Sequence, residues 1–218
     1  MGIFKLLHLQ SNFKTMRVAT KSDRTRVIEI IFKAYKDNPR FLSMIKPGTD
    51  EQFKKRLKWL SEFLFDTIEP LKSVFITSLG DGMCMVYKNT DRKETLYTWY
   101  LQIKMAIRVI GIFRGLEILK REGMVKKLRP AGEYLYFWVL AVDPDKKGFL
   151  DMQEIRDEVY ARADKINLPI VAETTVKKNR VMYLRYGFKE YNQLETSKDV
   201  TVYFMKREPG TVEERNKK

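Results

Sequence analysis

The residues whose types and spacing could do chemistry lie in the last third of the chain. A run of apolar residues over 134–142 predicts a strand, and the turn over 143–148 that follows it ends in Gly148. A helical pattern then runs to about Ile166. Because a glycine turn that opens a helix presents free backbone N–H groups and the positive end of the helix dipole, it can bind phosphate oxygens. We interpret this turn as a candidate site for a phosphate-bearing cofactor, although such turns are more often purely structural.

A second candidate follows in the next strand and helix. Residues 169–174 predict a strand, and the helix after it carries Asn179 and Tyr183. These two side chains are four residues apart and therefore share one face of the helix. Gly187 supplies a left-handed cap at the end of that helix. A buried Asn–Tyr pair is usually part of a core, but here both residues face the predicted gap between two strands.

The composition removes several catalytic schemes. The chain holds one histidine, His8, and one cysteine, Cys84. It therefore has no disulfide framework and no cysteine zinc site, and we predict no metal. Most Ser-His-Asp and Cys-His mechanisms are excluded as well. Acid–base chemistry must use Tyr, Glu, Asp, Lys, water or the cofactor, and a reducing, cytoplasmic compartment fits best.

The charge balance points to anionic partners without choosing one. The sequence has 42 Lys and Arg against 28 Asp and Glu, a net charge of +14. Such a chain could bind nucleic acid, an anionic membrane or small anions. Alternatively, and with equal weight, the net charge serves only to keep the protein soluble. The basic residues are spread along the chain without a block interleaved with aromatics, so we predict no nucleic-acid binding. No apolar run reaches the length of about 18 residues that spans a membrane.

The pattern of the first half predicts the elements that must hold these residues. We expect a strand over 15–20, a helix that begins at Ser22-Asp23 and ends at Asn38-Pro39, and a hairpin over 74–87. Thr49-x-x-Gln52 is a capping box before a second amphipathic helix. We treat 1–218 as one domain with an accessory segment over 1–13, a helical insertion over 95–130 and a charged tail over 208–218.

The insertion is rich in both apolar and basic residues. Its pattern is helical, and we expect Gly111 and Gly115 to bend or split it. The favoured interpretation is a helical pair that covers one face of the sheet. Two functional alternatives remain: the segment forms a wall of the substrate site, or its residues 97–127 form a surface that binds anionic lipid.

These motifs together resemble a known family. The segments Val142-Asp-Pro-x-x-Lys-Gly148, Ala172-Glu-Thr174 and Asn179-x-x-x-Tyr183-x-x-x-Gly187-Phe188 are similar to those of the GNAT acetyltransferase superfamily. With Arg129-Pro130 before the central strand, the pattern looks nearest to the branch that contains puromycin N-acetyltransferase. The resemblance is specific over 129–205 and plausible over 14–90.

The resemblance implies an α/β fold with a mixed, mostly antiparallel sheet of about six or seven strands and helices on both faces. The fourth and fifth strands would splay apart, and acetyl-CoA would lie between them. The residues that the resemblance assigns to the cofactor are Leu140, Ala141, Val142, Lys147, Gly148, Phe149, Leu150, Asp151, Met152, Asn179 and Tyr183. Tyr183 would protonate the leaving thiolate. The base would be Glu173 or a chain of water molecules, and a purely structural Glu173 is an equal alternative.

The implied activity is transfer of an acetyl group to a primary amine of a small molecule, by a monomer or homodimer. Two alternatives remain: a GNAT-fold protein that binds without catalysis, and a membrane-peripheral acyltransferase. The turn departs from the family pattern, because Leu150 and Met152 stand where small residues are usual and Asp151 adds a negative charge. We expect these to weaken pyrophosphate binding. Trp138 is expected to crowd the acceptor pocket.

Overall fold

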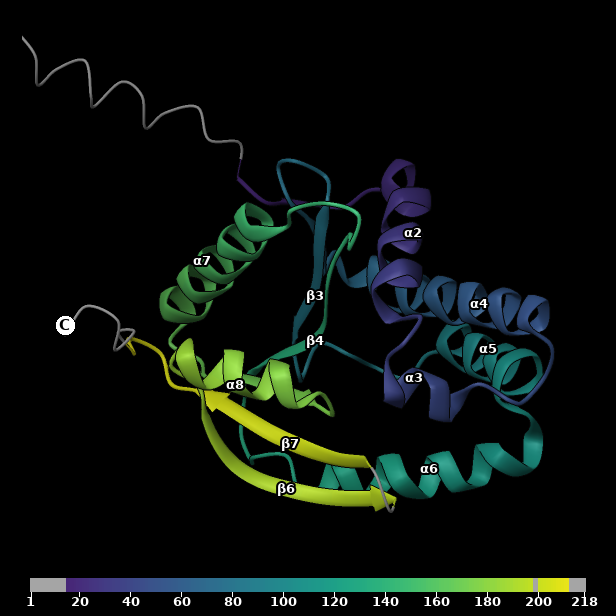
Figure 1. The fold of residues 1–218 in the computed structure, drawn as a ribbon. Coiled ribbons are helices and arrows are strands. Elements are labelled where there is room, and N and C mark those ends of the chain that lie inside the picture. The colour runs from purple at the N-terminus through teal and green to yellow at the C-terminus, as the bar shows by residue number, and fades with distance from the viewer. Residues whose placement is uncertain (1–14, 198–199, 212–218) are drawn as a thin grey trace, which may run out of the picture.

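A single mixed sheet forms the centre of the protein. The computed structural model describes residues 15–197 and 200–211 (Figure 1), so the accessory segment 1–13, His8 and most of the charged tail lie outside it. Within the described residues, seven strands pair in the order β1-β2-β3-β4-β5-β7-β6. Their bounds are Arg17–Val18 (β1), Val74–Ile76 (β2), Gly82–Lys88 (β3), Leu135–Val142 (β4), Ile170–Thr174 (β5), Lys189–Ser197 (β6) and Val200–Arg207 (β7). Of the strand pairs described, β4–β5 alone is parallel, which confirms the predicted mixed, mostly antiparallel sheet.

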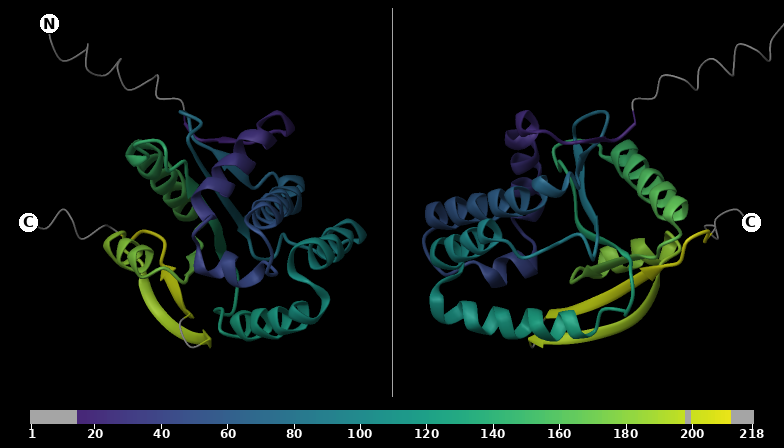
Figure 2. Two further views of the ribbon diagram at one scale, coloured as in Figure 1. Left: turned by 45° about the vertical axis from the view of Figure 1, so that its right-hand side comes forward. Right: turned by 180° about the vertical axis from the view of Figure 1, so that it is seen from behind.

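Helices cover both faces of the sheet, as predicted. Helices α7 (Phe149–Ile166) and α8 (Lys177–Arg185) lie on one side. On the other side lie α2 (Arg24–Tyr35), α3 (Pro39–Met44), α4 (Asp50–Ile68) and α5 (Leu96–Met105), and two further views show the same layers (Figure 2). Short 3-10 turns at Lys21–Asp23 and Glu69–Leu71 precede α2 and follow α4. The alternating side chains of β4 supply both cores, because successive residues of a strand point to opposite faces.

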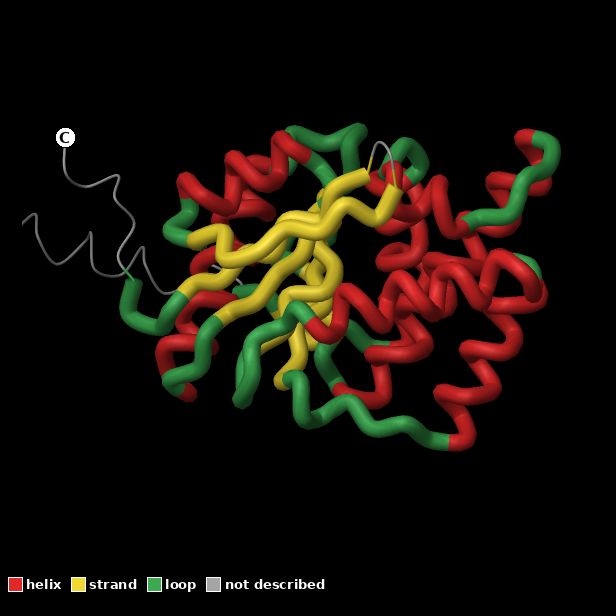
Figure 3. Tube along the Cα trace, turned by 90° about the horizontal axis from the view of Figure 1, so that it is seen from below, coloured by secondary structure: helices red, strands yellow, loops and turns green. Residues whose placement is uncertain are grey.

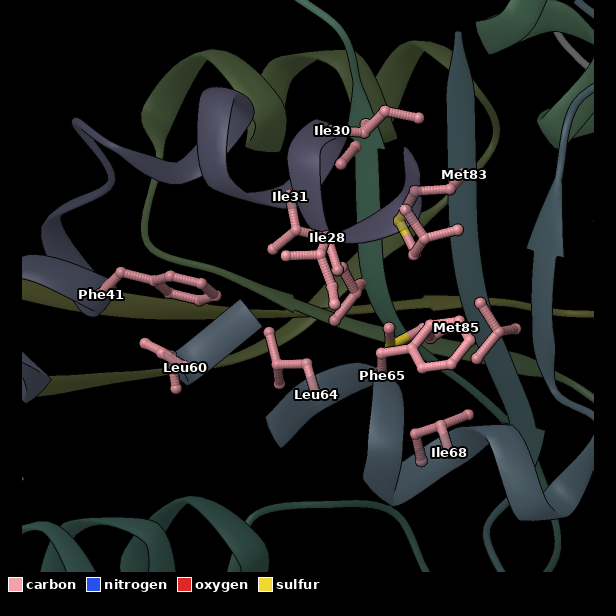
Figure 4. Close-up of a cluster of buried hydrophobic side chains, with 14 of the residues drawn as sticks. Ile28, Ile30, Ile31, Phe41, Leu60, Leu64, Phe65, Ile68, Met83 and Met85 are labelled. Atoms are coloured by element: carbon pink, nitrogen blue, oxygen red, sulfur yellow. The ribbon is translucent and has the colours of Figure 1, made fainter. Parts of the chain in front are cut away.

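The larger core lies between β3 and the helices α2 and α4. Ile30, Ile31 and Phe65 are fully buried there and face Met83 and Met85 of β3 (Figure 4). Burying a side chain of this size contributes about 1.5–3 kcal/mol to folding. This core fixes α2 against the sheet, and α2 in turn carries Tyr35 to the edge of β4.

The helix starts follow local hydrogen bonding. The capping box at Thr49 and Gln52 is confirmed. At the first helix, Asp23 accepts from the backbone N–H and the hydroxyl of Thr20, so it closes a 3-10 turn and gives α2 no side-chain cap. Asn38 caps α3, with Pro39 in its first turn. The Asn-Pro pair, which we predicted as a helix end, thus also begins a short helix that the apolar pattern had not indicated.

The insertion forms two helices that Gly111 separates. Helix α5 continues into a π-helical turn over Ala106–Ile110, and α6 (Ile112–Lys127) begins after Gly111, whose φ is +89°. The predicted split is present at Gly111, whereas Gly115 lies inside α6 and does not interrupt it. The end of α6 runs beside β6 and β7 (Figure 3), where Val125 packs on Val202 and Phe204.

Candidate functional site

The strands β4 and β5 pair for only three residues and then separate. Leu135, Tyr136 and Phe137 face Ile170, Val171 and Ala172, and beyond them no pairing between β4 and β5 is present in the described chain. We call the opening between residues 138–142 and residues 173–176 the notch. A cavity of about 750 Å³ fills the notch and extends to α3 and α4.

A β-bulge at Trp138 shapes the β4 side of the notch. Met85 pairs with Val139 and Val86 pairs with Phe137, so Trp138 is the extra residue. Both Trp138 and Val139 therefore pack toward the α2–α4 core. The indole of Trp138 lines the cavity, as expected, and the Arg92 guanidinium lies 5.1 Å from its ring centre.

The backbone of β4 offers two residues to the notch. Asp143 N–H donates to Asp81 O of the β3 side at 2.8 Å, and Met83 pairs with Ala141. Because backbone groups alternate in an antiparallel ladder, the N–H and C=O groups of Leu140 and Val142 turn toward the notch. The expectation that all three residues from Leu140 to Val142 offer their backbone was therefore wrong for Ala141, which is turned to β3.

Tyr35 already contacts one of these backbone positions. Its hydroxyl donates to Leu140 O at 2.9 Å and accepts a longer bond from Leu140 N–H at 3.4 Å. Burial raises the pKa of Tyr35 to about 12, so the hydroxyl is protonated at neutral pH. The sequence pattern gave no sign of this contact, because it joins residues 105 positions apart.

The turn after β4 has the shape that the glycine pattern indicated. Gly148 has φ +62°, and a Cβ there would come within 2.5 Å of Val142 Cγ1. Helix α7 begins at Phe149, so the N–H groups of its first turn have no partner within the helix. Met152 N–H, however, donates to Gly148 O at 3.0 Å and is not free for a ligand, while the Met152 side chain lines the cavity.

Most side chains of this turn lie outside the cavity, and the expected clash of Leu150 and Met152 with a pyrophosphate stays a prediction. Phe149 and Leu150 are 64% and 63% exposed, and neither lines the cavity; nor do Lys147, Gly148 and Asp151. Asp151 is buried and accepts a short hydrogen bond from the Thr77 hydroxyl beside the β2–β3 turn. The Asp151 carboxylate therefore points into the protein, and its expected repulsion of a pyrophosphate stays a prediction.

Helix α8 brings Tyr183 and Asn179 to the other side of the notch. Tyr183 is buried, and its ring packs on Phe188 with centres 4.9 Å apart. Burial raises the pKa of Tyr183 further than that of Tyr35, and no protein group in the described residues hydrogen-bonds its hydroxyl. Asn179 also lines the cavity, but it is exposed at the mouth rather than buried beside Tyr183.

Glu173 lies in a buried group of ion pairs at the base of the notch. Its carboxylate is 1% exposed and accepts from Arg129 Nε at 2.6 Å and from Arg40 Nη1 at 3.4 Å. Arg129 also donates to the Tyr136 hydroxyl at 2.8 Å and lies over that ring. Burial alone would lower the pKa of Arg129, but Tyr136 and Glu173 outweigh this and raise it.

Helix α6 completes this group through Glu122. Arg40 of α3 donates to both oxygens of Glu122 at 2.8 and 2.9 Å, and Glu122 lines the cavity. We call Arg40, Glu122, Arg129 and Glu173 the ion-pair network. The insertion thus supplies part of the cavity wall as well as covering the strands. Arg40 and Glu122 were missed at the sequence level, because nothing in their local pattern distinguishes them from surface charges.

Apolar and aromatic side chains line the rest of the cavity. Phe41 stacks on Tyr35 with ring centres 4.4 Å apart, and Phe63, Leu60 and Met44 extend this surface. A largely apolar cavity with a few convergent polar groups is the usual form of a small-molecule site. The cavity therefore has two ends, one at the notch and one between α3, α4 and α6.

The described residues contain no group of three or more His, Cys, Asp or Glu that could hold a metal ion. They also contain no helix with both the length and the apolar character needed to cross a bilayer.

Comparison with known proteins identifies the fold. No family model matches the sequence. A Corynebacterium glutamicum protein described as "histone acetyltransferase HPA2 and related acetyltransferase" is similar in structure, with TM-score 0.62 and 17% identity over 91% of this chain and 97% of that one. The C-terminal condensation domain of Ebony, solved with β-alanyl-dopamine, gives TM-score 0.61 and 14% identity over 88% and 97%. Arylalkylamine N-acetyltransferase 2 from Aedes aegypti gives TM-score 0.57 and 12% identity over 89% and 98%.

These likenesses cover nearly the whole of each protein and confirm the predicted GNAT fold. At such low sequence identity they support the assignment of the fold and not of a function. The resemblance to the puromycin N-acetyltransferase branch stays a prediction.

Proposed function

We propose that this protein transfers an acetyl group from acetyl-CoA to a primary amine of a small molecule, by direct attack of the amine. The observation that carries the proposal is the juxtaposition in the notch of an unpaired backbone edge on β4 and the unbonded Tyr183 hydroxyl on α8. An acyl donor bound along the β4 edge would bring its sulfur toward the Tyr183 hydroxyl, which could donate a proton to it.

The residues present fit acetyl-CoA. Leu140 and Val142 offer backbone groups to the amides of a pantetheine arm, and the first turn of α7 offers N–H groups to a pyrophosphate. Gly148 is required there, because any larger residue would meet Val142. Asn179 at the cavity mouth is free to hydrogen-bond the arm. One feature opposes binding: the Tyr35 hydroxyl must leave Leu140 before a ligand can pair with it.

The bound thioester supplies the activated acyl group. In our proposal Tyr183 donates its proton to the departing sulfur, and its raised pKa keeps that proton in place at neutral pH. Backbone N–H groups near the β4 bulge are suited to stabilise the negative charge that develops on the carbonyl oxygen.

The proton of the attacking amine needs an acceptor. Glu173 lines the cavity, but its carboxylate already binds Arg40 and Arg129. Each of its oxygens accepts a hydrogen bond from one of these guanidinium groups, so neither oxygen is free to face an amine. We therefore favour water in the cavity as the acceptor, with Glu173 holding the two arginines in place.

The similar structures lend support of a limited kind. They include N-acetyltransferases for arylalkylamines and for agmatine, and a domain in complex with β-alanyl-dopamine, an acylated amine. For this chain we infer the class of acceptor alone, an amine attached to an apolar or aromatic group. The apolar end of the cavity at Phe41, Phe63 and Trp138 favours that class.

Calorimetry and a thiol-release assay test the proposal together. Acetyl-CoA should bind the purified protein, and a panel of arylalkyl and alkyl amines should release CoA from it in proportion to the protein added. Binding without release for any amine would favour a second candidate, a GNAT-fold protein that binds a ligand without catalysis. The Tyr35–Leu140 contact is the observation that favours that candidate. No binding of acetyl-CoA would reject the proposal.

A further inference from the structure

The outer face of α5 carries apolar side chains that nothing in the described protein covers. These residues, which we call the α5 stripe, are Leu96, Trp99, Tyr100 and Ile103 of α5 and Ile107 of the π-helical turn that continues it, and each is between 56% and 91% exposed. Their spacing of three or four residues places them on one face of a helix. Leu101, Val109 and Ile110 on the opposite face are buried and hold the helix on the protein.

The position of α5 leaves this face open. Figure 1 shows α5 beside α4, on the side of the sheet away from α7. It packs against α4 through its inner face. Exposed apolar residues scattered singly need no explanation, but a continuous stripe of five on one helix marks a surface that meets a partner.

The charges within the segment that carries the stripe are positive. Residues 96–110 contain Lys104 and Arg108 and no Asp or Glu. Lys104 Nζ lies 5.8 Å from the ring centre of Tyr100. Arg108 Cζ and Lys55 Nζ lie 5.2 and 5.3 Å from the ring centre of Trp59 on neighbouring α4.

The acids Glu62 and Asp66 of α4 lie beside the buried Leu101 of α5, and Asp66 is paired with Arg24. The nearest acid in sequence, Glu94, accepts a hydrogen bond from Gln102 and so lies along a different face from the stripe.

Trp and Tyr between aliphatic residues, with Lys and Arg at the border, are typical of helices that lie in the interface of a lipid bilayer. The rings sit at the level of the headgroups, the aliphatic side chains enter the acyl boundary, and the long basic side chains reach anionic headgroups. Here a net charge of +14 on the whole chain adds a long-range attraction to the same surface.

We propose that the α5 stripe docks this protein onto an anionic membrane surface, with α5 parallel to the bilayer. A second copy of the chain fits less well. Residues 96–128 hold seven Lys or Arg and two Glu, and one of those acids, Glu122, is already paired with Arg40. A symmetric contact through the stripe would bring these like charges together. The proposal is independent of the acetyl-transfer function.

Vesicle flotation tests it with the intact protein. We compare vesicles of phosphatidylglycerol and phosphatidylcholine with vesicles of phosphatidylcholine alone, at low salt and at about 0.5 M salt. The wild type should float with the anionic vesicles at low salt, and both neutral lipid and added salt should reduce binding. Ile103→Glu should weaken binding to anionic vesicles by about tenfold or more, because it puts a charge in the middle of the stripe.

Leu79→Glu is the matched control, because Leu79 is 60% exposed and lies in the β2–β3 turn outside the stripe. It makes the same change of charge and should bind like the wild type. Equal losses in the two variants would mean that net charge alone acts, and would overturn docking through the stripe. Failure of the wild type to bind anionic vesicles would overturn it too. So would a wild-type dimer that Ile103→Glu converts to a monomer in sedimentation velocity.

Discussion

The two sides of the notch differ in how their polar groups are satisfied. On one side, the carboxylate of Glu173 and the guanidinium groups of Arg40 and Arg129 saturate one another. On the other side, most of the Tyr183 side chain is buried, but its hydroxyl reaches the cavity and has no hydrogen-bond partner among the described residues. The Glu173 carboxylate, in contrast, is only 1% exposed.

The difference distinguishes residues that hold the structure in place from a residue that is placed to take part in a reaction. A buried charge must be paired, since an unpaired one is very costly, and the pairing fixes its position and reduces its reactivity. A hydroxyl that faces a cavity without a protein partner keeps its proton for an incoming group. In our proposal the ion-pair network holds the shape of the cavity, whereas Tyr183 takes part in the reaction.

The largest expected effect is on stability, at Glu173. Glu173→Gln removes the buried carboxylate between Arg40 and Arg129 and leaves two partly buried cations without their shared partner. We expect the free energy of unfolding to fall by about 3 kcal/mol, measured by denaturant titration. Glu122→Gln is the control and should lose less, because that pair is more exposed. A Glu173→Gln protein that is fully stable but loses kcat about 100-fold would make Glu173 the base.

Tyr183→Phe tests the other side of the notch. It should lower kcat by about 100-fold and leave the KM for acetyl-CoA within about twofold, because the proton is needed only in the transition state. The raised pKa of Tyr183 also implies that the wild type keeps this acid protonated as pH rises, so kcat should show no falling limb from it below about pH 10.

Tyr160→Phe controls for the loss of a buried phenol hydroxyl. Tyr160 donates to Tyr186 O at 2.7 Å, so this variant should lose about 1 kcal/mol of stability and keep its kcat. Equal losses of kcat in both variants would remove the special role of Tyr183.

Gly148→Ala tests whether close approach in the turn is required. The new Cβ would meet Val142 Cγ1 at 2.5 Å and would hold a left-handed φ, so we expect about 2 kcal/mol of lost stability and a higher KM for acetyl-CoA. Gly80→Ala has a similar φ of +75° with no atom within 4 Å and measures the backbone strain alone. If the two variants behave alike, contact with Val142 is unimportant.

Tyr35→Phe should tighten the binding of acetyl-CoA by about fivefold, because it removes a hydroxyl that competes for the Leu140 backbone. Calorimetry on the wild type and the variant measures this directly. Weaker binding would show that the hydroxyl contacts the ligand rather than competing with it.

The smallest effect is expected at Leu150. Its side chain is exposed and does not line the cavity, so Leu150→Ala should change acetyl-CoA affinity by less than about twofold. Met152→Ala, which does remove a cavity-lining side chain, is the comparison and should change it more. A marked gain in affinity for Leu150→Ala would restore the original expectation of a steric clash at the phosphates.

Local signals in the sequence accounted for most of the fold. The glycine turn, the capping box at Thr49 and the apolar runs of β3, β4 and β5 each follow from short-range patterns, and all are confirmed. The short α3 was missed, because six residues give too few turns for an apolar period to be seen.

Long-range polar contacts could not be predicted. Arg40 meets Glu122 across 82 positions and Tyr35 meets Leu140 across 105, and neither pair has a local signature. The direction in which a side chain points could not be predicted from the sequence either. Asp151 looked like a charge at the phosphate position, but its partner Thr77 lies in another part of the chain. Such contacts depend on the packed sheet rather than on the neighbouring residues.

The place of β7 in the sheet has a consequence for how the protein is made. β7 lies between β5 and β6, although it follows both in the chain. A nascent chain that has emerged only as far as Ser197 therefore exposes the outer edge of β5, with its unpaired backbone, to the crowded cell. Such an edge is open to pairing with other chains. We expect the ribosome-bound intermediate to be the most aggregation-prone form of this protein, and synthesis of residues 200–207 to end that risk.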